Sequence, residues 1–118
     1  MKTILVVDDE LFLRDLVDRI LKRSGFETIV CSSGEEAILH IDVADALVTD
    51  FMMPEMNGAI LAQVVKKKRP NMPVLIMTGR PHLLPTYHMA DKVIAKPFDN
   101  VGIIPEWLLE VLPEEVTE

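Results

Sequence analysis

Three aspartates and a lysine directly follow short apolar runs, and their chemistry suits a phosphoryl site. Asp8 and Asp9 follow "ILVV", Asp50 follows "ALVT" and Lys96 follows "VIA". Carboxylates that lie close together repel one another, and protons or a hard divalent cation such as Mg²⁺ relieve the repulsion. A lysine ammonium suits a bound phosphoryl group, and a carboxylate beside a metal can act as a nucleophile. These residue types therefore indicate a magnesium and phosphoryl site with Asp50 as the nucleophile, if the fold brings them together.

The apolar runs have the pattern of a parallel β-sheet. Each run is short, nearly continuous and rich in Val and Ile, as expected for strands covered on both faces. They lie at residues 4–7, 28–31, 46–49, 74–77 and 93–95. Segments with helical spacing separate them, and strands that alternate with helices favour right-handed crossovers. The pattern predicts a doubly wound α/β fold with five parallel strands.

Three helices are predicted between these strands. The apolar positions of the first recur at helical spacing and Gly25 ends it; they are Leu13, Leu16, Val17, Ile20 and Leu21. Ser33 and Glu36 have the spacing of a capping box, which predicts a short second helix through Ala37, Ile38 and Ile41. The third helix has Leu61, Val64 and Val65 as its inward face and stops at "RPNMP".

The remaining segments have weaker helical patterns. Between the fourth and fifth strands, Pro81 can begin a helix but Pro85 would break it within a turn, so we expect a short or irregular fourth helix. The last helix is expected to start near Pro105 and to pack Trp107, Leu108 and Val111 inward. Residues 113–118 are acidic and are expected to form a frayed tail.

The position of each polar residue in the sheet determines whether these residues meet. In open α/β sheets, ligands bind outside the carboxyl ends of the strands, where the strand order reverses. With the flavodoxin-like order 2-1-3-4-5, the first and third strands are neighbours, so Asp8, Asp9 and Asp50 converge. Thr78 ends the fourth strand and supplies a hydroxyl at the same edge, and Lys96 follows the fifth strand.

Composition limits the class of protein. The chain has 118 residues, 49% of them hydrophobic, which suits one domain over residues 1–118. Its net charge of -7 disfavours nonspecific binding to nucleic acid or to an anionic membrane. Cys31 is the only cysteine, so no internal disulfide is possible, and the first apolar run is too short for a signal peptide or a membrane span. We therefore expect a cytoplasmic location and a protein or small-molecule partner.

At these positions the chain resembles the receiver domains of two-component response regulators. "VVDDE" is similar to the acidic pair of that family, "VTDFMMPEMNG" to its phosphoacceptor strand and loop, "VLIMTG" to its switch-hydroxyl strand and "AKPF" to its lysine loop. The resemblance runs from about Ile4 to Phe98. Each motif is weak alone, but the four in this order at strand ends are highly specific.

The resemblance implies a phosphorelay function. Asp50 would accept a phosphoryl group from a phosphohistidine on a histidine kinase or a histidine phosphotransfer protein, and the chain would then switch its contacts with a downstream protein effector. Asp9 and Asp50 would bind Mg²⁺ directly, with Asp8 acting mainly through water and the backbone carbonyl of Met52 as a third protein ligand.

The resemblance also assigns roles to the other residues of the site. Lys96 would pair with the phosphoryl oxygens, and Thr78 would move to hydrogen-bond the phosphorylated form. The peptide bond between Lys96 and Pro97 is a candidate cis bond. Pro54 and Gly58 would shape the loop from which Met52 offers its carbonyl.

Two features depart from the family pattern. Val93 stands where receivers usually carry an aromatic residue that couples to the switch hydroxyl, and the segment from Thr78 to Lys96 is shorter than usual by about one helical turn. Both departures affect a face through which many receivers signal. We therefore predict that phosphorylation orders or repacks residues 79–92.

Other functions remain as alternatives. A degenerate receiver would act as an interaction module without phosphorylation. Val93 and the shortened segment keep this alternative open, whereas the retained acidic pair, Asp50, Thr78 and Lys96 argue against it. A magnesium-dependent phosphohydrolase of the haloacid dehalogenase type needs Asp-x-Asp after the first strand, whereas Asp8 and Asp9 are adjacent here. We therefore expect a signalling domain, with only self-phosphorylation and self-dephosphorylation chemistry, rather than an enzyme.

Overall fold

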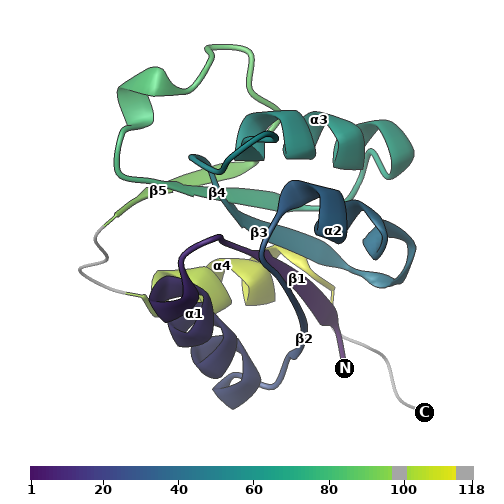
Figure 1. Cartoon of the computed structure of the whole chain (residues 1–118). Coiled ribbons are helices and arrows are strands. Elements are labelled where there is room, and N and C mark those ends of the chain that lie inside the picture. The colour runs from purple at the N-terminus through teal and green to yellow at the C-terminus, as the bar shows by residue number, and fades with distance from the viewer. Residues whose placement is uncertain (97–100, 114–118) are drawn as a thin grey trace.

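The computed structural model describes residues 1–96 and 101–113 and contains one five-stranded sheet. Its strands are all parallel and follow the order β2-β1-β3-β4-β5 (Figure 1). They are β1 (Thr3–Val7), β2 (Glu27–Cys31), β3 (Ala46–Asp50), β4 (Val74–Thr78) and β5 (Lys92–Ala95). The predicted doubly wound α/β fold and its strand order are confirmed.

Helices cover both faces of this sheet. Figure 1 shows α2 (Gly34–Ile38) and α3 (Gly58–Lys68) on one face, and α1 (Leu11–Arg23) and α4 (Ile103–Val111) on the other. Two cores result, because successive side chains of a strand point to opposite faces. Leu5 of β1 packs in the core under α2 and α3, whereas Val6 packs in the core under α1 and α4.

The ends of the first two helices follow from local sequence signals. After α1, Gly25 adopts a positive φ of 94°, and the amides of Gly25 and Phe26 donate to the carbonyls of Lys22 and Leu21. These are the two hydrogen bonds of a Schellman motif. At α2, the Ser33 side chain accepts the Glu36 amide, as predicted. The helix itself is shorter than expected.

Two helix predictions need correction. α2 ends at Ile38, and Ile41 lies instead in the 3-10 turn η1 (Ile41–Val43). The last helix begins at Ile103, near Pro105 as expected, and the proline is tolerated in the first turn because the amide it lacks would have no partner within the helix. The other correction concerns its inward face. Val111 was expected to face inward but is 37% exposed, whereas Leu108 is fully buried.

The segment between β4 and β5 contains only one short helical turn, as predicted. This turn is η2 (Pro81–Leu83), which Pro81 begins. The segment is held at its far end by Asp91, whose carboxylate accepts from Lys66 Nζ at 2.7 Å and from the Val74 amide at 2.9 Å. At its near end, the Arg80 amide donates to the Thr78 hydroxyl at 3.0 Å.

Gly58 allows α3 to begin against the end of β3. Its amide donates to the Phe51 carbonyl at 2.8 Å, and a Cβ added at this position would lie only 2.3 Å from the Asp50 carbonyl oxygen. That oxygen belongs to the backbone of a fully buried strand and cannot move aside cheaply. The glycine therefore sets the distance between the helix and the strand end that carries Asp50.

Replacing Gly58 with alanine is expected to destabilise the protein by about 2 to 3 kcal/mol, because the new methyl group overlaps the backbone of β3. Urea denaturation of the parent and the variant measures this difference. Gly79→Ala is the matched control, since a Cβ there would meet its nearest atom at an ordinary 3.8 Å. Equal losses in the two variants would show that the contact with β3 is not the cause.

Candidate functional site

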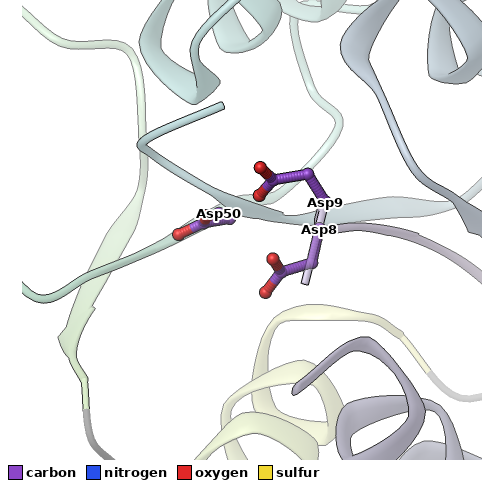
Figure 2. Close-up of side chains that lie close together, drawn as sticks. All are labelled: Asp8, Asp9 and Asp50. Carbon is purple, nitrogen blue, oxygen red and sulfur yellow. The ribbon is translucent and has the colours of Figure 1, made fainter. Parts of the chain in front are cut away.

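Three carboxylates meet at the carboxyl edge of the sheet. The register of β1 and β3 pairs Val7 with Thr49, so the next residues along the chain, Asp8 and Asp50, lie side by side. One oxygen from each of Asp8, Asp9 and Asp50 lies within 4.8 Å of the others. Figure 2 shows these side chains at the ends of β1 and β3. Asp8 and Asp50 are buried, whereas Asp9 is exposed.

Lys96 bridges the two buried carboxylates. Its Nζ lies 3.0 Å from Asp8 Oδ2 and 3.0 Å from Asp50 Oδ1, and only 12% of its side chain is exposed. The Lys96 amide also donates to the Thr78 carbonyl at 2.9 Å, which fixes the chain beyond β5 to the end of β4. The ammonium group of Lys96, which follows β5, is therefore held between the ends of β1 and β3.

Burial and mutual repulsion change the protonation of this cluster. Burial, followed by the charge of Asp8, raises the pKa of Asp50 from 3.8 to about 6, although Lys96 opposes the rise. Burial alone lowers the pKa of Lys96, but its contacts with Asp50 and Asp8 outweigh burial and raise that pKa above 10.5. Asp50 is thus mostly ionised at neutral pH, and Lys96 remains charged.

A pocket of about 390 Å³ lies beside Asp50 and Lys96. Its other lining residues are Glu10, Leu13, Met52, Gly79 and Arg80. Met52 is 53% exposed on the loop after β3, in which Glu55 has a positive φ of 68°. Thr78 is fully buried at the end of β4.

Most of the side chains predicted to form the site lie at this edge of the sheet. The three aspartates and Lys96 come together, and Thr78 ends the neighbouring strand. Val93, which stands where the resemblance predicts an aromatic residue, is half-buried in β5. The candidate cis bond involves Pro97, which lies outside the described residues.

Arg14 is part of this site but was missed in the sequence. Its Nη1 donates to the Asp8 carbonyl at 3.2 Å, and its Nε is buried. The signal available was an arginine one turn into a helix that begins directly after the acidic pair. Glu10 follows the acidic pair, and its amide donates to Asp8 Oδ1 at 2.9 Å, a backbone contact that no residue type reveals.

The donor set of this cluster fits a hard divalent cation. All three side chains offer oxygen, and none of the described residues adds a sulfur or imidazole ligand to the group. Mg²⁺ prefers oxygen ligands and keeps several waters, so few protein ligands suffice. The exposed Asp9 leaves the cluster open to solvent on one side.

Comparison with known proteins identifies the family. The model of the "response regulator receiver domain" family matches residues 4–105. This chain belongs to the response regulator receiver domains. Receiver domains are signalling domains of two-component systems, and response regulators are phosphorylated by histidine kinases.

Curated relatives of this receiver include two bacterial transcriptional regulators. The DNA-binding transcriptional regulator NtrC of Rhizobium meliloti is 32% identical over 117 residues, which cover 92% of this chain and 24% of NtrC. The alkaline phosphatase synthesis transcriptional regulatory protein PhoP of Bacillus subtilis is 33% identical over 103 residues, covering 82% of this chain and 43% of PhoP. The receiver thus spans less than half the length of these relatives.

Solved structures of receivers share this fold. The response regulator protein TrrA from Thermotoga maritima, in complex with Mg²⁺-BeF, has a TM-score of 0.84 at 30% identity, with 95% of this chain and 100% of that chain covered. A response regulator receiver domain protein from Clostridium thermocellum has a TM-score of 0.84 at 26% identity, with 94% of each chain covered. In the described part of the receiver, no helix is long and apolar enough to cross a membrane.

Proposed function

We propose that this receiver accepts a phosphoryl group on Asp50 from a phosphohistidine partner. The observation that carries the proposal is the placement of Lys96, whose Nζ lies 3.0 Å from both Asp50 and Asp8. One cation here serves two buried carboxylates, and Asp9 adds a third carboxylate beside them. The cluster therefore retains an excess of negative charge that a divalent cation would offset, and Lys96 is in place to pair with the oxygens of a phosphoryl group on Asp50.

In the transfer, a carboxylate oxygen of Asp50 attacks the phosphorus atom of the phosphohistidine. A new O–P bond forms and the N–P bond breaks, and the imidazole nitrogen keeps the electron pair and takes a proton from solvent. Asp50 must be ionised to attack, which its pKa of about 6 allows at neutral pH. Lys96 stabilises negative charge on the phosphoryl oxygens because it is already held at Asp50.

Asp8, Asp9 and Asp50 are the residues that would hold Mg²⁺, with the Met52 carbonyl as the further ligand implied by the family resemblance. Bound Mg²⁺ would supply positive charge that reduces repulsion between the carboxylates and an incoming phosphoryl group. The TrrA structure, which contains Mg²⁺-BeF, supports this assignment at 30% identity.

The affinity of the receiver for Mg²⁺ is expected to fall below about pH 6. Protons and Mg²⁺ compete for Asp50, whose pKa in the metal-free protein is about 6. Below that pH the affinity should weaken by up to about tenfold per pH unit, and above about pH 7 it should be nearly constant. Calorimetric titration across this range measures the dependence. Equal affinities at about pH 5 and pH 7 would contradict competition at Asp50.

The phosphorylated state is proposed to act on residues 79–92. The Thr78 hydroxyl accepts the Arg80 amide, so a Thr78 side chain that turned toward a phosphoryl group would release the start of this segment. Val93 offers no ring to follow that movement. Amide hydrogen exchange with and without beryllofluoride tests the proposal, and similar protection of residues 79–92 in both states would argue against it.

Intact-mass analysis after incubation with acetyl phosphate and Mg²⁺ tests the proposed function directly. The expected result is one phosphoryl adduct that requires Mg²⁺, with the modification mapped to Asp50 by borohydride reduction and peptide sequencing. The absence of an adduct, under conditions that label a control receiver, would favour a receiver that acts as an interaction module without phosphorylation.

A protein effector and a location in the cytoplasm remain part of the proposal. The net charge of -7 supports a protein partner over nucleic acid, although the relative NtrC is itself named a DNA-binding regulator. We also propose that residues 1–118 form one domain, since both cores flank the same sheet. We further propose that this domain turns over no external substrate. Incubation with a phosphate ester tests the last point, and continuous release of phosphate would favour a phosphohydrolase.

A further inference from the structure

We propose that Arg14 is a positioning residue that orients Asp9 toward the metal site by holding the peptide between Asp8 and Asp9. This inference rests on the proposed function, because it concerns the same acidic cluster. It assigns a role to a helix residue that contributes no ligand. The guanidinium would act through the backbone of the loop and not through contact with the phosphoryl group.

The two acidic neighbours differ in how their side chains are held. The Asp8 carboxylate is buried and held by two contacts, to Lys96 Nζ at 3.0 Å and to the Glu10 amide at 2.9 Å. The Asp9 side chain is exposed and has no hydrogen bond or ion pair within residues 1–96 and 101–113. The Asp9 carboxylate can therefore reach the metal site only from the place where the backbone puts its Cβ atom.

Two hydrogen bonds fix that backbone. The Asp8 amide donates to the Cys31 carbonyl at 3.2 Å, which ties the loop to β2. The Asp8 carbonyl accepts from Arg14 Nη1, also at 3.2 Å, which ties the next peptide to α1. Because a peptide unit is planar, holding its carbonyl oxygen also sets the direction in which the chain enters Asp9.

Helix capping does not perform this task. Glu10 is the N-cap residue of α1, but its side chain makes no capping hydrogen bond. The Arg14 amide donates to the Glu10 carbonyl at 3.0 Å, so the first turn of the helix presents the arginine directly under the loop. The same residue thus joins the loop to the helix through both its backbone and its side chain.

The Nε of Arg14 is buried and has no hydrogen-bond partner in the described structure. An unpartnered buried N–H costs stability, and an apolar side chain of similar length would avoid that cost. Packing alone therefore does not account for an arginine here. Its contribution is the hydrogen bond to Asp8, which affects the geometry of the acidic loop more than the stability of the fold.

The experiment compares Arg14→Met, Arg14→Lys and the parent, with Arg19→Met as the matched control. Arg19 is exposed on the same helix, and its replacement removes the same charge without touching the loop. We expect Arg14→Met to lower Mg²⁺ affinity by about tenfold in calorimetric titration, as loss of an outer contact to a metal ligand typically does. Arg14→Lys should recover part of the affinity, because an ammonium can still donate to the Asp8 carbonyl.

A second measurement uses no metal and no phosphoryl donor. In metal-free protein, hydrogen exchange of the Glu10 amide should be faster in Arg14→Met than in the parent, because this amide donates to the Asp8 side chain beside the released peptide. The free energy of unfolding should change little, because loss of the hydrogen bond to the Asp8 carbonyl is offset by removal of the unpartnered Nε. A purely structural arginine would lower that free energy and leave the Mg²⁺ affinity of the folded protein unchanged.

The outcomes separate this inference from the proposed function. If Arg14→Met binds Mg²⁺ as tightly as Arg19→Met or more tightly, the positioning role is overturned, because loss of positive charge would then be the main effect. If the parent accepts no phosphoryl group on Asp50, the proposed function fails, yet the exchange of the Glu10 amide still decides whether Arg14 holds the loop.

Discussion

Replacing Asp50 with asparagine is expected to abolish the phosphoryl adduct and to make the metal-free protein more stable. The amide cannot attack phosphorus, so no covalent product forms under conditions that label the parent. The stability gain arises because the ionised carboxylate is held at a cost beside Asp8 in a buried position. The asparagine side chain keeps nearly the same shape without that charge.

The pH dependence of this gain follows from the pKa of Asp50. In the folded protein the pKa is about 6 and the ordinary value is 3.8, so the folded state binds the proton more tightly than the unfolded state. The ionised carboxylate therefore costs the fold stability above about pH 6, and the cost disappears as the pH falls toward 4. Asp50→Asn should be more stable by about 1 to 3 kcal/mol near pH 8 and nearly equal near pH 4.

Urea denaturation at several pH values measures this difference, and intact-mass analysis measures the adduct. Asp15→Asn is the matched control, since Asp15 is exposed on α1 and the change removes the same charge. It should keep the adduct and shift stability little. Saturating Mg²⁺ should stabilise the parent more than Asp50→Asn, because binding stabilises only a fold that retains the ligands. An adduct that persists in Asp50→Asn would place the phosphoacceptor elsewhere.

Replacing Lys96 with methionine is expected to slow phosphorylation by about a hundredfold and to destabilise the metal-free protein. The transferred group loses the cation held beside Asp50, and preorganised charges of this kind contribute two to three orders of magnitude to rates. The fold retains two buried carboxylates without their shared partner. Removing one side of a buried charge pair commonly costs about 3 to 5 kcal/mol, and protonation of Asp50 reduces that cost.

The Lys96 prediction also has a defined pH dependence. Lys96 now lowers the pKa of Asp50, so its removal raises that pKa further above the ordinary value. Because a carboxyl with a raised pKa destabilises the fold only when it is ionised, the loss in Lys96→Met should be larger near pH 8 than near pH 5. Chemical denaturation at the two pH values measures the difference.

A measurement of Mg²⁺ binding separates the effect of Lys96 on phosphoryl transfer from its effect on the charge of the acidic cluster. Lys96 and Mg²⁺ neutralise the same carboxylates, so Lys96→Met should bind Mg²⁺ at least as tightly as the parent while it accepts phosphate more slowly. Lys67→Met is the control, because Lys67 is exposed near the end of α3. Phosphorylation at the parent rate in Lys96→Met would show that the lysine serves stability alone.

The fold could be predicted from the sequence because its signals are local. Short Val-rich and Ile-rich runs that alternate with helical spacing allow few arrangements other than a parallel sheet covered on both faces. The irregular segment after β4 was also predictable, since Pro81 starts a turn that Pro85 cannot continue. Residue patterns were less reliable on α4, where Val111 is 37% exposed. There the helix orientation depends on packing and not on the pattern alone.

The groups available at the carboxyl edge could be read from the sequence, because a residue that ends a parallel strand must lie at that edge. How these groups interact depends on the folded chain. The bridge from Lys96 to two carboxylates depends on how β1, β3 and β5 are placed relative to one another in the sheet. The pKa of Asp50 depends on its burial beside Asp8. The contact between Arg14 and the Asp8 carbonyl is equally tertiary, since a backbone acceptor has no signature in a sequence.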